Sequence, residues 1–187
     1  SATQRLSIEG KETDFEWERS IIQSFDIETV PATLTDLRPD TTRILDALRT
    51  NEEHFDLPLT SPYEFTFDPE AVKSLAGILR GNDWKARVVI RHTDEIVAFL
   101  PAETPVYGLA VDIGTTKVAA YLVEMESGET VAKSGAMNPQ IAYGEDIISR
   151  IRYINDHPAD GLKTLQGRII ETLNNLIEEL GKEAKVK

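Results

Sequence analysis

Alternating and clustered apolar residues predict a first region with about four strands. Residues 19–30 alternate partly between apolar and polar side chains, which is typical of a strand. Residues 85–91 and 95–100 are apolar runs on either side of a tight turn at residues 92–94, and this arrangement predicts a hairpin. Residues 63–67 are a further strand candidate.

Two helices are expected between these strands. Asp40 is expected as the N-cap of the first helix, which should end near Asn51. The second helix has the stronger start signal, with Asp68 as a capping carboxylate and Pro69 at the first helical position, and Gly81 is expected to end it. The apolar residues at helical spacing are Ile44, Leu45 and Leu48 in the first helix, and Val72, Leu75, Ile78 and Leu79 in the second.

A segment bounded by two prolines, residues 101–105, separates this region from a second one. We therefore interpret residues 19–104 as a small α+β middle domain and place a domain boundary directly after it. Beyond the boundary, three apolar strands are expected in quick succession, at residues 107–112, 117–124 and 130–136.

The second region continues with a loop and two helices. Residues 137–146 show no periodicity. A short helix then ends at His157, and a long helix begins after a cap at Asp160 and stops at Gly181. Apolar side chains lie on one side of each helix, at Ile147, Ile148, Ile151 and Ile154 and at Leu162, Leu165, Ile169, Ile170, Leu173, Leu176, Ile177 and Leu180. The chain ends where another strand would be expected, so we interpret residues 105–187 as the first part of a truncated domain.

The composition narrows the class of protein. The 187 residues are 41% hydrophobic and carry a net charge of −12, which disfavours nucleic acid and anionic membranes as partners, because both bind basic surfaces. There is no cysteine, so these residues hold neither a disulfide nor an iron–sulfur cluster bound through thiolates. The sequence shows no apolar run of membrane-spanning length and no secretion signal, and we expect a cytoplasmic location. Residues 1–18 carry little pattern and are interpreted as a linker.

The best candidate for chemistry is the stretch YGLAVDIGTTKVA, which begins at Tyr107. An apolar strand there runs into Asp112, and a turn with Gly114, Thr115 and Thr116 precedes the next strand. The amides and hydroxyls of such a turn donate to phosphate oxygens, its glycine lets the backbone come close, and Asp112 suits a hydrated Mg2+. The alternative is a plain β-hairpin whose turn has no ligand.

Further polar residues lie close to this turn in the sequence. Lys117 follows it directly and either reaches a phosphate or points to solvent. Glu145 and Asp146 open the short helix, where carboxylates are favoured as caps, and the cap is the more economical interpretation. The functional alternative, which we assign to Asp146, is a catalytic carboxylate that orients water or Mg2+ near a terminal phosphate. Asn138 and Gln140 lie in the aperiodic loop before it.

Two segments resemble known proteins. GLAVDIGTTKVA at residues 108–119 is similar to the first phosphate loop of the superfamily of actin, sugar kinases and heat-shock-chaperone ATPases, which share a ribonuclease H-type fold. NPQIAYGEDIISRI at residues 138–151 resembles a segment of the ATP-dependent reductive activators of corrinoid proteins. The resemblance implies an α/β chain in which residues 105–187 are the N-terminal part of an actin-like ATPase domain.

The resemblance also implies an activity. Such activators reduce the Co(II) corrinoid of a methyltransferase system to Co(I) and couple this electron transfer to ATP hydrolysis. ATP and Mg2+ are then the expected cofactors, a corrinoid protein is the expected partner, and the implied nucleotide-binding residues are Asp112, Gly114, Thr115, Thr116 and Lys117, with Asp112 also as the metal ligand. The [2Fe-2S] cluster of the family would belong to an N-terminal domain outside this chain. The second half of the ATP site would belong to the rest of the nucleotide-binding domain, also outside this chain. We therefore expect the chain by itself to bind no cofactor tightly.

Two other functions remain open. One is a small-molecule kinase of the same superfamily, although about 100 residues precede the phosphate loop here and most such kinases begin with it. The other is a non-enzymatic docking or dimerisation module, in which the hairpin is purely structural. A homodimer would cover the apolar positions expected on residues 162–180.

Overall fold

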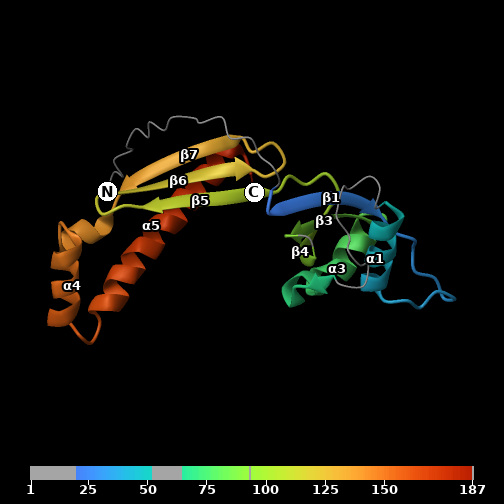
Figure 1. Ribbon diagram of the computed structural model, residues 1–187, viewed down its shortest axis with the longest axis horizontal. Coiled ribbons are helices and arrows are strands. Elements are labelled where there is room, and N and C mark those ends of the chain that lie inside the picture. Colours follow the sequence, from blue (N-terminus) through green and yellow to red (C-terminus); the bar gives the residue numbers. More distant parts are fainter. Residues whose placement is uncertain (1–19, 52–64, 93, 187) are drawn as a thin grey trace. The chain divides into compact units, whose positions relative to one another are not determined.

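The computed structural model describes residues 20–51, 65–92 and 94–186. The chain forms two compact units that divide between Val106 and Tyr107, and each unit contains one β-sheet (Figure 1). The described residues form four α-helices and one short 3-10 helix besides these sheets, so the predicted mixed α/β class is confirmed. The linker expected at residues 1–18 lies outside the described residues.

The first unit is built on a sheet with the strand order β1-β3-β4-β2. Strand β1 (Ile22–Glu28) pairs antiparallel with β3 (Lys85–Arg91), and β3 pairs antiparallel with β4 (Glu95–Leu100). The short β2 (Thr66–Phe67) runs parallel to β4. Each of these strands lies where the hydrophobic pattern predicted one.

Strand alternation and one irregularity place the core residues of this sheet. Ala86, Val88 and Ile90 alternate along β3 and are fully buried in one hydrophobic cluster. The register between β3 and β4 shifts at Val89 and Ile90, so β4 carries an extra residue there. Because of this bulge, Ile96 and Phe99 reach the same cluster although their spacing is odd.

Two helices, α1 (Asp40–Thr50) and α3 (Pro69–Gly81), cover the cluster with their apolar faces (Figure 1). The predicted cap of α3 is confirmed, because the Asp68 carboxylate accepts a hydrogen bond from the backbone N–H of Glu70 over 2.7 Å. The expected cap of α1 is wrong: Pro39 holds the N-cap position, and the Asp40 carboxylate forms an ion pair with Arg80 of α3 instead.

The apolar face of α3 differs by one position from the expected one. Val72 remains 39% exposed, and Ala71 is buried in its place together with Leu75 and Leu79. Positions 71, 75 and 79 are separated by four residues each, so they lie along one ridge of the helix, and this ridge faces the sheet.

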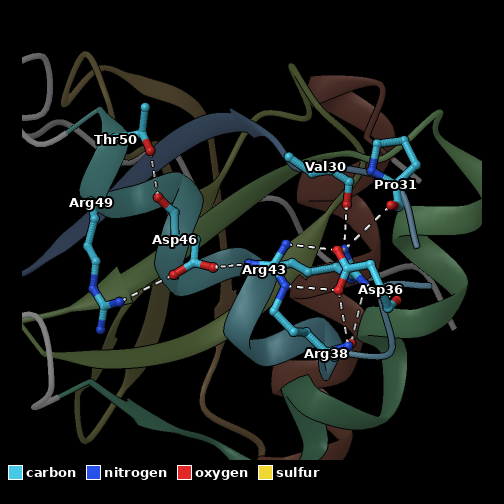
Figure 2. A network of polar contacts seen from close by, with 8 residues as sticks. All are labelled: Val30, Pro31, Asp36, Arg38, Arg43, Asp46, Arg49 and Thr50. Atoms are coloured by element: carbon cyan, nitrogen blue, oxygen red, sulfur yellow. Dashed lines mark hydrogen bonds and ion pairs between the residues drawn. The ribbon is translucent and has the colours of Figure 1, made fainter. Parts of the chain in front are cut away.

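A buried arginine organises the connection between β1 and α1 (Figure 2). The Arg43 side chain is fully buried and donates to the carbonyl oxygens of Val30 and Asp36 over 3.0 and 2.8 Å, and to an Asp36 carboxylate oxygen over 2.8 Å. Arg38 forms a second ion pair with Asp36. The two guanidiniums, with Arg38 first, hold the pKa of the Asp36 carboxyl well below its usual range. The polar backbone of this connection is thereby hydrogen-bonded inside the unit.

The proline-bounded segment at residues 101–105 is held against the first unit. The Asp26 carboxylate of β1 accepts from the backbone N–H of Glu103 over 3.0 Å, and the Arg87 guanidinium of β3 donates to the Thr104 carbonyl over 3.1 Å. Arg87 also hydrogen-bonds to both carboxylate oxygens of Asp26. The sheet of the first unit therefore fixes the segment through Glu103 and Thr104.

The second unit contains an antiparallel sheet with the order β5-β6-β7. The strands are β5 (Tyr107–Ile113), β6 (Lys117–Glu124) and β7 (Thr130–Met137), close to the predicted ranges. The 3-10 helix η1 (Pro139–Tyr143) and the helices α4 (Ile147–Asp156) and α5 (Gly161–Ala184) follow, with α5 along one face of the sheet (Figure 1).

Small residues let α5 pack closely on this sheet. Val118 and Ala120 of β6 and Ala132 and Ala136 of β7 are buried against the long helix, where Leu176 and Leu180 are the buried leucines of the cluster. The small alanine side chains on the strands leave room for the large leucine side chains of the helix, so the interface is closely packed.

The ends of α5 differ from the expected ones. Gly181 does not stop the helix, which continues to Ala184 and ends with Lys185 in the left-handed conformation, at a φ of 57°. The backbone N–H groups of Lys185 and Val186 donate to carbonyls of the last turn, and this closes the helix without a glycine at its end. Asp160 holds the N-cap position, but its side chain makes no capping hydrogen bond.

Several large apolar side chains of the second unit are exposed. They are Leu109, Val111 and Ile113 on β5, Val131 and Met137 on β7, Ile147, Ile148 and Ile151 on α4, and Leu162, Ile170 and Ile177 on α5. The predicted helical periodicity of α4 is thus present, but the residue that α4 buries is Arg150. Across the described part of the chain, none of the helices is long and apolar enough to cross a bilayer.

Candidate functional site

The turn between β5 and β6 is a tight hairpin turn. The backbone N–H of Gly114 donates to the Lys117 carbonyl over 2.8 Å. A Cβ atom at position 114 would lie only 2.8 Å from that same carbonyl oxygen, closer than real Cβ contacts allow. Glycine is required here because the two strands approach each other so closely, and this gives a structural reason for the residue in the candidate phosphate turn.

Asn138, directly after β7, holds the turn from one side. Its side chain is almost fully buried, with 1% exposure. The backbone N–H of Asn138 donates to the Thr116 carbonyl, and its side-chain Nδ2 donates to the Gly114 carbonyl, both over 2.8 Å. The Oδ1 atom accepts from the backbone N–H of Gln140 and so caps η1. Both polar atoms of this side-chain amide thus hydrogen-bond to the turn or to the start of η1.

Arg150 of α4 binds the remaining carbonyl of the turn. Its Nη2 donates to the Thr115 carbonyl over 2.6 Å, while Nε donates to the Gly144 carbonyl over 2.9 Å and Nη1 to the Oε1 atom of Gln140 over 3.2 Å. The residue is only 7% exposed. The backbone carbonyls of Gly114, Thr115 and Thr116 are therefore all hydrogen-bonded to Asn138 or Arg150.

These bonds fix the direction of the amides. In a trans peptide the carbonyl and the following N–H point in opposite directions. With three successive carbonyls turned toward Asn138 and Arg150, the N–H groups of Thr115, Thr116 and Lys117 point away from them. In the described part of the chain, the N–H groups of Thr115 and Thr116 have no hydrogen-bond partner, and both residues are exposed. Successive N–H groups aimed the same way are suited to binding an anion.

The other expected site residues lie around this turn. Asp112 is the penultimate residue of β5, pairs with Ala119 in the register and is exposed, as is Lys117 at the start of β6. The described residues contain no group of three or more His, Cys, Asp or Glu side chains that could hold a metal ion. Mg2+ readily keeps several waters and takes substrate phosphates as ligands, so a single carboxylate such as Asp112 fits a Mg2+–nucleotide better than a bare metal site.

Asp146 is the N-cap of α4. Its Oδ1 atom accepts from the backbone N–H of Ser149 over 2.7 Å. This hydrogen bond is the main cause that lowers the pKa of the Asp146 carboxyl. The carboxylate is thus ionised at neutral pH and a weak base. It suits orienting water or a hydrated cation better than abstracting a proton.

The sequence analysis missed two residues of this arrangement. No role was predicted from the sequence for Gly144 or for Arg150, which flanks the isoleucine face of α4, three positions after Ile147 and four before Ile154. A Cβ atom at position 144 would lie 2.7 Å from Cβ of Ser149 and 2.8 Å from the backbone nitrogen of Arg150. The available signal in the sequence was the place of both residues in NPQIAYGEDIISRI, because α4 also carries the exposed Arg152 and helical spacing does not tell the two arginines apart.

Family comparisons assign both units. A family model described as "RACo linker region" matches residues 11–105, and one described as "Raco_middle: RACo middle region" matches residues 107–187. The chain belongs to the RACo family. The two RACo matches meet where the compact units divide, between Val106 and Tyr107. The RACo descriptions use "linker" for the region that the sequence analysis called the middle domain, and "middle" for the region that it assigned to the ATPase domain.

Individual RACo-related proteins agree with this assignment. The chain is 40% identical over 101 residues to a protein of Eubacterium limosum named "Corrinoid activation enzyme RamQ", an alignment that covers 52% of this chain and 17% of that protein. A solved structure titled "Reductive activator for corrinoid,iron-sulfur protein" matches with a TM-score of 0.67 and 28% identity, over 99% of this chain and 28% of the other. The predicted resemblance to corrinoid reductive activators is confirmed. The chain spans a minor part of the length of both relatives.

Proposed function

We propose that this chain supplies the first half of the ATP site of a reductive activator that returns the Co(II) corrinoid of a methyltransferase system to Co(I). RACo membership and the names of the two similar proteins support the activity. The observation that supports the ATP site is the hairpin turn. Its three carbonyls accept hydrogen bonds from Asn138 and Arg150, and the N–H groups of Thr115 and Thr116 point away from these two residues.

Each residue of the turn would have a separate role in binding a nucleotide. The backbone amides and the hydroxyls of Thr115 and Thr116 donate to phosphate oxygens, and Lys117 adds a positive charge beside them. Asp112 would hold a hydrated Mg2+, which would supply positive charge beside the phosphates. Asp146, as an ionised carboxylate, would orient the attacking water or a hydrated cation.

The reduction itself requires one electron per cobalt. In this proposal a low-potential donor would supply the electron and a [2Fe-2S] cluster would pass it on. The chain has no cysteine, so the ligands of such a cluster would come from residues outside it. ATP acts through conformation. It drives the transfer only if the nucleotide-bound and nucleotide-free forms differ in their affinity for the corrinoid protein.

The proposal also includes an assignment of the two regions of the chain to domains. We assign residues 105–187 to the first part of an actin-like, ribonuclease H-type ATPase domain and residues 19–104 to a preceding α+β domain. The exposed apolar side chains on α5, among them Leu162 and Ile177, support a homodimer or a contact with another part of the protein. The cytoplasmic location expected from the sequence stays a prediction.

The decisive experiment follows cobalt reduction in the full-length protein. A corrinoid protein in the Co(II) state is mixed with the activator and a low-potential reductant, and Co(I) formation is recorded by absorbance with ATP, without nucleotide and with a non-hydrolysable ATP analogue. ATP hydrolysis that leaves the Co(II) corrinoid unreduced would contradict the activator.

A variant pair connects this activity to the turn. Thr115→Val removes a hydroxyl from the turn, and we expect it to lower ATP-dependent Co(I) formation about tenfold or more, the range of a lost hydrogen bond to a charged group. Thr130→Val makes the same change at an exposed position at the start of β7 and should leave the rate unchanged.

A further inference from the structure

We infer that Arg150 is a positioning residue for ATP, which keeps the hairpin turn in the conformation that receives the phosphates. The inference rests on the proposed function, since it takes the turn to be the phosphate site. It adds a residue outside the turn, 35 positions away in the sequence from the carbonyl that it binds.

The first reason is the geometry of the guanidinium. All three nitrogens of Arg150 donate to oxygens of the second unit, and the shortest of these contacts is the one to the Thr115 carbonyl. The planar fork holds that carbonyl on one side of the turn, and the amide of Thr116 is consequently held on the other. Rotation of this peptide would withdraw one phosphate donor, and Arg150 opposes the rotation.

The second reason is charge. No carboxylate of the described residues forms an ion pair with Arg150, although its side chain is almost fully buried. Its partners are neutral carbonyl and amide oxygens. The charge also acts on the nearby Asp146 carboxylate and contributes to lowering its pKa, so Asp146 offsets part of it. The remaining charge adds a favourable potential at the turn for an anion such as a triphosphate, and burial weakens the screening by salt.

The third reason is the anchoring of Arg150 itself. Gln140 accepts from Arg150 and donates through Nε2 to the Leu165 carbonyl of α5 over 3.0 Å. The missing side chain at Gly144 lets the carbonyl of that residue meet the Nε atom of Arg150 at the start of α4. The arginine is thus fixed to η1, α4 and α5 before any ligand arrives, as preorganised binding requires.

The test compares ligands with and without phosphate. Full-length Arg150→Met is titrated with ATP and with adenosine, beside the matched control Arg152→Met on the exposed side of the same helix. We expect the Kd for ATP to rise about ten- to a hundredfold in Arg150→Met, as for the loss of a charged hydrogen bond and its charge, while the Kd for adenosine changes less than about threefold. The control should bind both ligands as the natural protein does.

Two further variants separate charge from shape. Arg150→Lys keeps the charge but not the planar fork, so its Kd for ATP should lie between those of the natural protein and Arg150→Met. Gln140→Met removes one anchor of Arg150 without touching the turn, and it should weaken ATP binding severalfold with no change for adenosine. If Arg150→Met does not fold, these two variants carry the test.

The outcomes are distinct. Unchanged ATP affinity in folded Arg150→Met and Gln140→Met overturns the inference and leaves the proposed function intact. An equal loss of ATP and adenosine binding also overturns it, because a merely structural role affects both ligands. Failure of the natural full-length protein to bind ATP overturns the proposed function first, before any variant is made.

Discussion

The Nη2 atom of Arg150 donates to the backbone carbonyl of Thr115 over 2.6 Å. This contact joins the start of α4 to the hairpin turn between β5 and β6. The two sequence segments that carry the family resemblance, residues 108–119 and 138–151, are therefore parts of one hydrogen-bonded structure. The second segment donates hydrogen bonds to the carbonyls of the turn, and the turn presents the N–H groups of Thr115 and Thr116 to solvent.

Asn138 should be among the least replaceable polar residues of the second unit. Asn138→Asp exchanges the donor to the Gly114 carbonyl for a charged acceptor in a site with 1% exposure, so we expect the free energy of unfolding to fall by about 2–3 kcal/mol or more. Denaturant unfolding followed by far-UV circular dichroism measures this. The matched change at an exposed position of α5, Asn174→Asp, should cost less than about 1 kcal/mol. Similar losses in both variants would argue against the hydrogen bond.

Gly144→Ala should destabilise the start of α4. The added Cβ atom would meet Ser149 and the backbone of Arg150 at 2.7–2.8 Å, and we expect a loss of about 1–3 kcal/mol from this overpacking. Gly167→Ala is the control, because a Cβ atom at that position of α5 meets nothing within 4 Å. It should stabilise the helix by about 0.5–1 kcal/mol. A stable Gly144→Ala protein would show that the turn of α4 can move away from Gly144.

Arg43→Met should destabilise the first unit strongly. The change leaves the carbonyls of Val30 and Asp36 without their donor and the Asp36 carboxylate without its buried partner, so we expect a loss of about 3 kcal/mol or more. Tryptophan fluorescence reports on this unit through Trp84, which packs against its hydrophobic cluster. The control Arg91→Met removes an exposed ion pair with Glu95 and should cost less than about 1 kcal/mol.

The Asp26–Arg87 pair should contribute to acid sensitivity. The hydrogen bonds from Arg87, together with the backbone N–H of Glu103, lower the pKa of the Asp26 carboxyl below its usual range. A pKa that is lower in the folded state stabilises the fold above the ordinary Asp pKa of about 4, and this stabilisation is lost as the pH falls through the lowered value. Asp26→Asn should therefore be less stable than the natural protein at pH 7, and the difference should shrink below about pH 4.

Urea midpoints measured by tryptophan fluorescence between pH 7 and pH 2.5 give this comparison. Asp94→Asn is a suitable control, since Asp94 is exposed and its side chain makes no hydrogen bond among the described residues. A difference between Asp26→Asn and the natural protein that stays constant over the whole pH range would show that the ionisation of Asp26 does not contribute.

Local rules were sufficient for most elements of the fold. The strands followed from alternation and apolar runs, and α3 followed from Asp68 and Pro69, because capping and the fixed φ of proline act within a few residues. Asp40 shows the limit of such rules. The same residue type before a helical pattern was expected as a cap, yet an arginine on another helix, Arg80, binds its carboxylate.

The sequence by itself determined the periodicity of the elements, the Gly114–Thr116 turn and the family to which they belong. Only the tertiary structure decided which faces are buried and what holds the turn. Helical spacing placed the isoleucines of α4 on one side, but it could not show that α4 buries Arg150 instead. The reason is physical: a hydrogen bond between residues 35 positions apart depends on how the elements pack, whereas periodicity reports only on neighbours along the chain.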